Sequence, residues 1–435
     1  MKKTAIIAVA PLLLAAALSA CGAGPPPAAT TKAQTTQAAT ERATTEPETL
    51  PADSTALVWN YSADRYDPAL ARQAALYAML AYDDSAFTAD GSYYSKSERE
   101  EKPVPKALHA QLARDGYQSV ESGNYGNKKE HDISYTLAYQ NLSGGQALLV
   151  VALRGTDGLE WRGNMDVGRN STRHESFEKA NRALQKDVEA YAKRHQLEDI
   201  VFFVTGHSRG AAVANLFAVD LSHNLTKLES GADSVFCYTF ATPNNTTEPA
   251  GEKNIFNFCF TDDFVPQVPL ARWGYGKAGT TFTASAQGLY ETSPAFKSLV
   301  DTNTSLSYQR APSFNHAATD KVLEDFYSLA PSVKVYYTKE YTMAPDHGWI
   351  TGEIDLSMHG FMREYIGNAA ALGLDDIGAS LGSALKRLPA GNDVKAVADY
   401  FIEGWLPPHS RDSINDTHQA FTYYAALKTG GFPVP

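Results

Sequence analysis

The chain has 435 residues, which leaves room for one large domain or two ordinary domains once processed segments are removed. Hydrophobic residues make up 43% of it and aromatic residues 11%, so the chain can bury a sizeable core and is not disordered throughout. Its formal net charge of −11 gives no long-range attraction for nucleic acid or anionic lipid, so neither is an expected partner.

The N-terminus has the pattern of an export signal. Two lysines precede an almost wholly apolar run from Ala5 to Ala20, which is shorter than the about 20 residues that span a bilayer as a helix. The sequence Leu-Ser-Ala-Cys ending at Cys21 resembles the lipobox of bacterial lipoproteins. That resemblance implies a signal peptide at 1–20, lipidation of Cys21 and an exported membrane lipoprotein facing away from the cytoplasm. The alternative is an ordinary secretory signal with an incidental cysteine.

The segment after the signal has a different composition from the rest of the chain. Residues 21–52 are rich in Thr, Ala and Pro and have almost no large apolar side chain. Such a segment cannot bury enough surface to fold, so we expect a flexible tether. The folded domain is expected over 53–435.

Two cysteines remain after the signal, Cys237 and Cys259. Two thiols in an exported chain allow one disulfide. Both, however, lie in apolar runs typical of buried strands. We therefore expect free, buried thiols rather than a disulfide.

Strand-like and helix-like segments alternate through the middle of the chain. Asp67-Pro68 has the pattern of a helix start, with a capping carboxylate followed by proline at the first helical position. Further on, apolar runs typical of buried strands alternate with amphipathic stretches. We expect strands at 134–139, 147–153, 200–205, 234–240 and 254–260, and helices at 175–194, from 208 onward and at 419–427. This alternation predicts an α/β fold with a mostly parallel sheet covered by helices.

The motif Gly206-x-Ser208-x-Gly210 falls at a predicted strand-to-helix junction, which is the setting that a nucleophile elbow requires. The turn is so tight that the positions two before and two after the serine must lack side-chain bulk. It also puts the hydroxyl at a helix N-terminus, where free N–H groups favour developing negative charge. We therefore predict that Ser208 is a catalytic nucleophile. The alternative is an ordinary glycine-rich turn.

Four segments resemble, in the family's order, motifs of the class 3 lipases, which have the α/β-hydrolase fold. They are Leu-Arg-Gly-Thr at 153–156 with Trp161 beyond it, the elbow at 204–211, Thr-Phe-Ala-Thr-Pro at 239–243 and Asp-Phe-Val-Pro at 263–266. Each motif alone is modest, but the ordered set is specific. The resemblance covers about a third of the chain.

The resemblance implies two roles besides the nucleophile. Asp263 would be the carboxylate that orients the histidine, and Thr156 with the backbone N–H of Arg209 would form the oxyanion hole. Thr156 and Asp263 each follow an expected strand directly, where catalytic groups of parallel sheets collect. Asp262 would cap a turn equally well, but only Asp263 has the family's offset from the following proline.

The elbow departs from the family in two residues. Arg209 and Ala211 stand where the family often has leucine and glycine. The guanidinium of Arg209 would lie either near the oxyanion hole or in a salt bridge away from it, and both arrangements stay open at this point.

The base must follow the acid in chain order, and two histidines are candidates. His418 comes just before the expected final helix, as family histidines typically do, so we prefer it to His359. With His418 as the base, residues 285–410 are an insertion between acid and base. Such an insertion overhangs the site and is a candidate lid or substrate-binding cap, or else an elaboration without a gating role.

Together these features predict a secreted, lipid-anchored serine hydrolase that cleaves carboxylic esters through an acyl-enzyme. The family resemblance implies acylglycerols or other lipid esters as substrates. No metal or other cofactor is expected, because no cluster with ligand spacing appears in the sequence. Two alternatives stay open: an esterase, amidase or acyltransferase of another substrate class, and a non-catalytic surface lipoprotein that binds a ligand.

Overall fold

A computed structural model describes residues 59–82, 104–125, 131–156, 164, 167, 171–302, 312–320, 323, 334–343, 346–355 and 416–433. The signal peptide with Cys21, the tether, Trp161 and His359 lie outside these residues.

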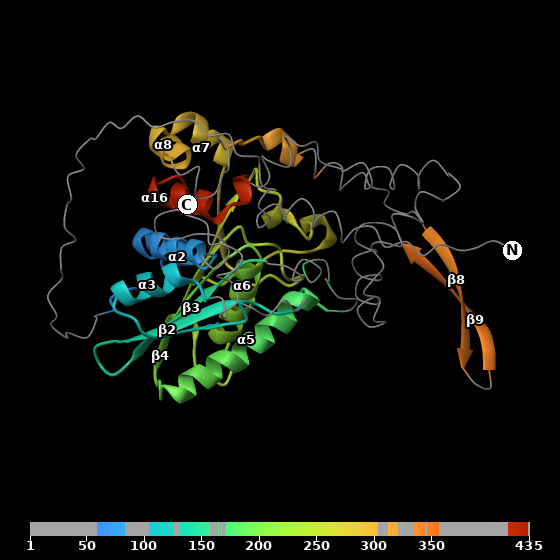
Figure 1. Cartoon of the computed structure of the whole chain (residues 1–435), viewed down its shortest axis with the longest axis horizontal. Helices are drawn as coiled ribbons and strands as arrows, with labels where there is room; N and C mark the ends of the chain where they lie inside the picture. The colour runs from blue at the N-terminus through green and yellow to red at the C-terminus, as the bar shows by residue number, and fades with distance from the viewer. Residues whose placement is uncertain are drawn as a thin grey trace, which may run out of the picture.

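A sheet forms the centre of the domain (Figure 1). It has seven strands, which follow one another across the sheet in chain order. They are β1 (Gln118–Gly123), β2 (Tyr135–Asn141), β3 (Ala147–Leu153), β4 (Ile200–His207), β5 (Val235–Phe240), β6 (Ile255–Phe260) and β7 (Thr280–Ala284). β1, β2 and β3 pair antiparallel, whereas β3 to β7 pair parallel. The predicted mostly parallel sheet is confirmed, and the structure adds β1 and β7 at its edges.

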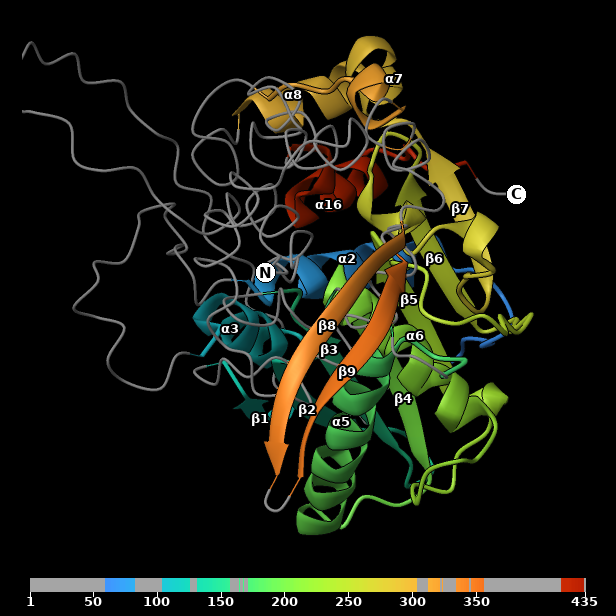
Figure 2. The same ribbon diagram turned by 90° about the vertical axis from the view of Figure 1, so that its right-hand side faces the viewer.

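Helices cover both faces of this sheet (Figure 2). One face packs against α2 (Pro68–Leu80), α3 (Lys106–Arg114) and α16 (Ala420–Lys428), and the other against α5 (Glu175–Arg194) and α6 (Arg209–Ser222). α7 (Ala286–Thr292) and α8 (Pro294–Thr302) contact α16. Short 3-10 turns lie at Ala232–Ser234, Val265–Gln267 and Ala271–Trp273.

The candidate cap at 285–410 contains α7, α8 and a second, two-stranded antiparallel sheet. That hairpin is formed by β8 (Lys334–Met343) and β9 (Asp346–Asp355). Most of the remaining candidate cap lies outside the described residues.

The composition of β3 follows from its central position. All seven of its residues are apolar and buried, because helices lie on both faces of the sheet. Leu148, Val150 and Ala152 point into the core shared with α2 and α16. The alternate residues point into the core shared with α5 and α6. β3 therefore contributes side chains to the apolar core on each face of the sheet.

The expected helix start at Asp67-Pro68 is confirmed. The Asp67 carboxylate accepts hydrogen bonds from the backbone N–H groups of Ala69 and Leu70, and Pro68 is the first helical residue. α2 buries its small residues against β4 and β5 and packs beside α16. The beginning and the end of the domain are thus joined through these two helices.

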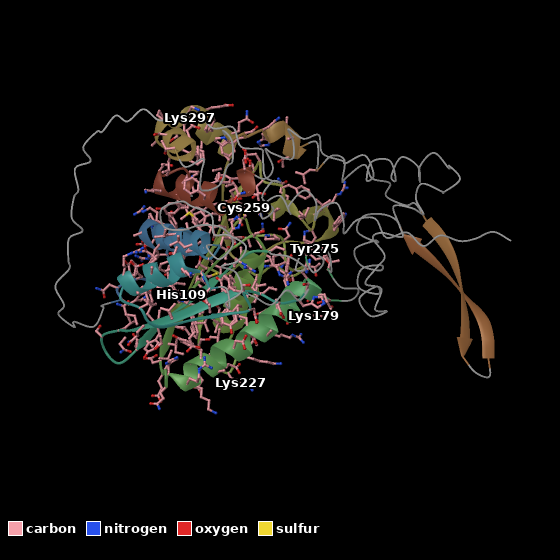
Figure 3. All side chains as sticks on the ribbon, viewed as in Figure 1. His109, Lys179, Lys227, Cys259, Tyr275 and Lys297 are labelled. Atoms are coloured by element: carbon pink, nitrogen blue, oxygen red, sulfur yellow. The ribbon has the colours of Figure 1, made fainter. Side chains whose placement is uncertain are left out.

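Cys237 and Cys259 are free and buried, as expected. Figure 3 shows Cys259 within the body of the domain, whereas Lys179 and Lys227 lie at its periphery.

Among the described residues, no helix is both long and apolar enough to cross a membrane.

Candidate active site

Ser208 occupies a strained turn between β4 and α6. Its backbone has φ 57° and ψ −126°, in a region that non-glycine residues rarely adopt, and its N–H donates to the carbonyl of Phe240 at 2.9 Å. A Cβ atom at Gly206 would lie 2.5 Å from the carbonyl oxygen of Gly210. A Cβ at Gly210 would lie 2.6 Å from the carbonyl oxygens of Leu153 and Arg154. The two glycines therefore permit the turn and the close approach of the end of β3.

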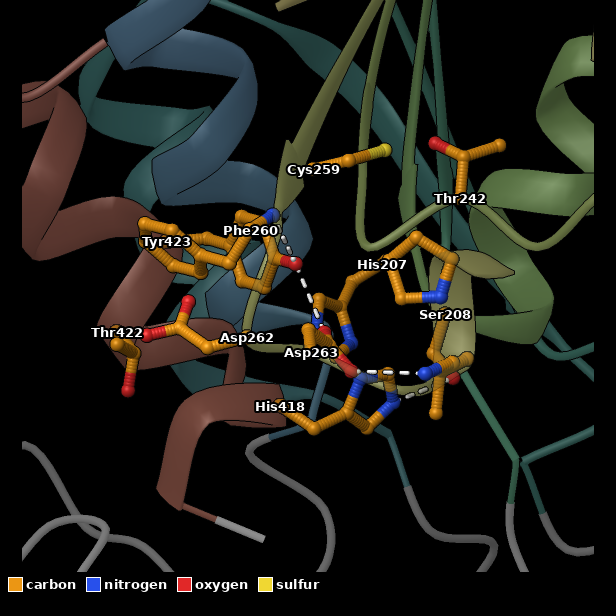
Figure 4. Close-up of polar contacts among 12 residues, drawn as sticks. His207, Ser208, Thr242, Cys259, Phe260, Asp262, Asp263, His418, Thr422 and Tyr423 are labelled. Carbon is orange, nitrogen blue, oxygen red and sulfur yellow. Dashed lines mark hydrogen bonds and ion pairs between the residues drawn. The ribbon is translucent and has the colours of Figure 1, made fainter. Parts of the chain in front are cut away.

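The structure brings Ser208, His418 and Asp263 together (Figure 4). Oγ of Ser208 is 2.8 Å from Nε2 of His418, and Nδ1 of His418 is 2.8 Å from Oδ2 of Asp263. Because an ionised carboxylate can only accept, the proton of a neutral His418 lies on Nδ1, and Nε2 accepts from the serine hydroxyl. All three side chains are buried. This is the geometry that a general base and a nucleophile require.

Two further donors hold the Asp263 carboxylate. The N–H of Val265 donates to Oδ1 at 2.9 Å, and the hydroxyl of Tyr423 donates to Oδ2 at 2.8 Å. The Tyr423 oxygen in turn accepts from the N–H of Phe260 at 3.0 Å. Burial raises the pKa of Tyr423 well above its usual value, so the phenol stays protonated and can donate. The carboxylate is therefore held by the turn that follows β6 and by α16.

The neighbouring Asp262 has a separate structural task. Its carboxylate accepts from the N–H groups of Ala286 and Gln287 and from the hydroxyl of Ser285. Asp262 thus stabilises the start of α7, which is the capping role that the sequence left open for it. Only Asp263 contacts the histidine.

A second histidine lies against His418. The rings of His207 and His418 have centroids 4.8 Å apart, and Nδ1 of His207 is 2.7 Å from the hydroxyl of Tyr82. Burial lowers the pKa of His207 well below its usual value, with the nearby His418 contributing. His207 is therefore neutral and adds no repulsive charge when His418 takes up a proton.

Lys277 ties together the loops that follow β5 and β6. Its ammonium donates to the backbone carbonyls of Thr242 and Pro266, and lies 3.7 Å from Sγ of Cys259. Burial lowers the pKa of Lys277. Because Pro266 belongs to the turn after Asp263, these contacts restrain the loop that carries the carboxylate.

Thr156 follows β3, near the start of α6. Its Oγ1 accepts a hydrogen bond from Nδ2 of Asn164 at 2.8 Å. The guanidinium of Arg209 donates to Oδ1 of the same Asn164 at 3.0 Å. The sequence left open whether this guanidinium lies near the oxyanion hole or in a salt bridge away from it. In the structure it donates to the side-chain amide of Asn164, which in turn contacts the predicted oxyanion-hole residue Thr156.

The sequence singled out Ser208, Asp263, His418 and Thr156, but not the partners that hold them. Tyr423 was recognisable as an aromatic residue after His418, yet nothing indicated its contact with Asp263. Asn164 and Lys277 belong to no motif. The described residues contain no group of three or more His, Cys, Asp or Glu side chains that could hold a metal ion.

Residues 150–273 match the family described as Lipase (class 3). This segment is similar to the core of class 3 lipases. It contains the elbow with Ser208 and the loop with Asp263, whereas His418 lies beyond it. The predicted resemblance is therefore confirmed, and with it the expected α/β-hydrolase fold and the expected lipase-like ester hydrolase.

Solved structures of lipases show fold similarity to the chain. A structure titled as a triacylglycerol lipase with a serine protease triad is 19% identical, covering 48% of this chain and 78% of its own, with a TM-score of 0.33. The Rhizomucor miehei lipase propeptide complex, in a deletion mutant form, is 18% identical over 52% and 69%, with a TM-score of 0.35. The lipase of Rhizopus microsporus var. chinensis is 18% identical over 49% and 73%, with a TM-score of 0.31. No curated protein matches the chain in sequence.

Proposed function

We propose that this chain, through its class 3 lipase-like core, hydrolyses carboxylic esters of lipids with a Ser208–His418–Asp263 triad. The observation that carries the proposal is the pair of 2.8 Å contacts that joins the serine hydroxyl to the histidine and the histidine to the carboxylate. Lipid esters, acylglycerols among them, are the substrates that the family match supports.

In the proposed mechanism, Nε2 of His418 takes the proton of Ser208 as its Oγ attacks the ester carbonyl. Asp263 stabilises the resulting imidazolium through Nδ1. The tetrahedral oxyanion accepts hydrogen bonds from the Thr156 hydroxyl and from the backbone N–H of Arg209. His418 then protonates the leaving alcohol, and a water molecule, activated by the same imidazole, releases the acyl group as the acid.

A fluorophosphonate probe tests the nucleophile and the base together. Wild type should be labelled, and Ser208→Ala should not. His418→Ala should lower the labelling rate and ester turnover by about 10⁶-fold, because the serine loses its base. His359→Ala and the exposed His223→Ala are the matched controls and should label like wild type. Loss of labelling in a folded His359→Ala, with His418→Ala unaffected, would assign the base to His359 instead.

The substrate class is tested with a chain-length series of nitrophenyl esters and with emulsified triacylglycerol. A lipase should prefer long acyl chains presented at an interface. A sharp preference for acetyl or aromatic acyl groups would instead indicate an esterase of another class. A wild-type protein that neither reacts with the probe nor cleaves any ester would favour the binding lipoprotein.

We also propose that the chain is exported and held to a membrane through lipidated Cys21. The argument is the basic and apolar leader followed by the Leu-Ser-Ala-Cys sequence. Two acyl chains on one cysteine would anchor the protein stably, where a single chain would be marginal. Cys21→Ser should release the protein to the medium or leave the precursor uncut. Unchanged membrane retention of this variant would count against the anchor.

A further inference from the structure

The side chain of Arg209 is enclosed beside the elbow rather than exposed. Only 1% of the residue is accessible, and its guanidinium carbon lies 5.4 Å from the centre of the Phe177 ring. Nη2 donates to the Ser176 hydroxyl and to the carbonyl of Asp132, each at 3.1 Å. Nη1 donates to Oδ1 of Asn164 at 3.0 Å. These contacts hold the guanidinium in one orientation.

Asn164 takes part in three hydrogen bonds. Its Oδ1 accepts from Arg209, its backbone carbonyl accepts from Nε2 of His174 at 3.1 Å, and its Nδ2 faces Oγ1 of Thr156 at 2.8 Å. Burial lowers the pKa of His174 to about 3, so this imidazole is neutral and donates with one nitrogen. Arg209 therefore holds the side-chain amide on one side and Thr156 contacts it on the other, while His174 holds the backbone of Asn164.

The chemistry of the arginine decides which way this amide faces. A guanidinium has donors and no acceptor, so the atom of Asn164 that it contacts must be the oxygen. The nitrogen of the amide consequently faces Thr156, and it can only donate. Oγ1 of Thr156 must accept that hydrogen bond, which leaves the hydroxyl proton of Thr156 for a different acceptor.

We propose that the Arg209 side chain is a positioning group, which acts through Asn164 to keep the Thr156 hydroxyl as a donor to the oxyanion. The inference rests on the proposed ester hydrolysis and goes beyond the backbone role of Arg209 in it. A leucine, which the family often has at this position, contributes no donor and would let the amide turn over. With the amide oxygen facing Thr156, the hydroxyl would be drawn into donating to Asn164 instead.

A double-mutant cycle on kcat for a nitrophenyl ester tests the chain of contacts. Thr156→Val removes the hydroxyl and should lower kcat by about 100-fold with little change in KM. Arg209→Leu keeps the backbone N–H, and where Thr156 is present it should lower kcat about tenfold. In the Thr156→Val background the same change should alter kcat less than about twofold, because no hydroxyl is left to position. Arg209→Lys also only donates, but it cannot reproduce the planar contacts of the guanidinium, so it should recover only part of the lost activity.

Arg173→Leu is the matched control. Arg173 pairs with Glu178 and Asp220, so its loss should lower the melting temperature. Arg173→Leu should change kcat neither in the wild-type background nor in the Thr156→Val background. Asn164→Asp provides a second route that opens no cavity. A carboxylate can only accept, so Thr156 would have to donate to it, and kcat should again fall about tenfold.

Three results would separate the possibilities. Equal effects of Arg209→Leu in both backgrounds would overturn the positioning role, as would a wild-type kcat in folded Asn164→Asp. If Arg209→Leu does not fold, the effect of Asn164→Asp on kcat is compared in the wild-type and Thr156→Val backgrounds instead, and equal effects would again overturn the positioning role. A wild-type protein without Ser208-dependent turnover would instead overturn the proposed hydrolysis.

Discussion

The hydroxyl of Tyr423 donates a 2.8 Å hydrogen bond to Oδ2 of Asp263. The same oxygen atom accepts from Nδ1 of His418, five residues earlier in the chain. One carboxylate oxygen therefore receives both donors from the segment that begins α16. The orientation of the imidazole and the docking of this helix are set by the same pair of contacts.

Removing this hydroxyl with Tyr423→Phe should lower both stability and turnover. Asp263 would lose one donor and the N–H of Phe260 would lose its acceptor, at a cost of about 1–3 kcal/mol in unfolding free energy. We expect kcat to fall about tenfold with KM nearly unchanged, because the imidazole loses part of its alignment. Urea unfolding and steady-state kinetics measure the two effects.

Tyr424→Phe is the control for that experiment. Tyr424 is half-buried and packs its ring against Phe421 in the same helix. It should behave like wild type in both measurements. If the two variants were indistinguishable in kcat, Tyr423 would have only a packing role.

Adding a methyl group at the elbow should be poorly tolerated. In Gly206→Ala and Gly210→Ala the new Cβ would approach backbone atoms at 2.5 and 2.6 Å, which no rotamer change can relieve. We expect a loss of about 3 kcal/mol in unfolding free energy, with activity reduced in the fraction that folds. Gly231→Ala is the matched control, since a Cβ there meets no atom within 4 Å. Equal melting temperatures for all three variants would contradict the steric argument.

Stability should fall as the pH drops below about 6.5, partly through His174. Burial lowers the pKa of His174 from 6.5 to about 3, so between these values the unfolded chain binds a proton that the native protein does not. The neutral His174 costs no stability above pH 6.5. Below pH 6.5 the free energy of unfolding falls by about 1.4 kcal/mol for each pH unit, because the unfolded chain is stabilised by the proton that it binds. From pH 7.5 to pH 5 this amounts to about 2 kcal/mol.

Unfolding in urea at pH 7.5 and at pH 5 measures this dependence. His174→Gln should reduce the difference between the two pH values by about 2 kcal/mol. The exposed His223→Gln should leave the difference as it is in wild type. An unchanged difference in folded His174→Gln would show that His174 becomes protonated without unfolding.

Both domain thiols should be unreactive in the native protein. Cys237 and Cys259 are buried, and burial raises the pKa of each, so neither thiolate forms readily at pH 8. In a Cys21→Ser chain, dithionitrobenzoate should titrate no thiol rapidly before denaturation and two afterwards. Zero thiols in denaturant without reductant would indicate a disulfide.

The regular elements were the most predictable part of the fold. β3 and α5 begin and end where their apolar patterns predict, because a strand buried on both faces and a long amphipathic helix have the strongest periodic patterns. β1 and β7 were missed. Both lie at the sheet edges and have partly exposed residues, so their sequences lack the continuous apolar run on which the other assignments depended.

The candidate site was predictable only where its residues belong to motifs. Ser208 and Asp263 stand at fixed offsets from glycines and prolines that the backbone requires. Asn164 and Tyr423 are held by contacts between segments far apart in the chain, and no local pattern encodes such contacts. The side chain of Arg209 illustrates this limit: its position depended on which acceptors surrounded it in three dimensions.

The distance along the chain between Ser208 and His418 is 210 residues. A single proteolytic cut anywhere between Asp263 and His418 would leave nucleophile and acid on one fragment and the base on the other. Because α16 packs on α2, near the opposite end of the domain, the short fragment has a binding surface on the long one. The nicked protein should therefore keep its activity as a non-covalent pair and lose it on dilution, which would make hydrolysis a direct measure of how tightly the last helix is bound.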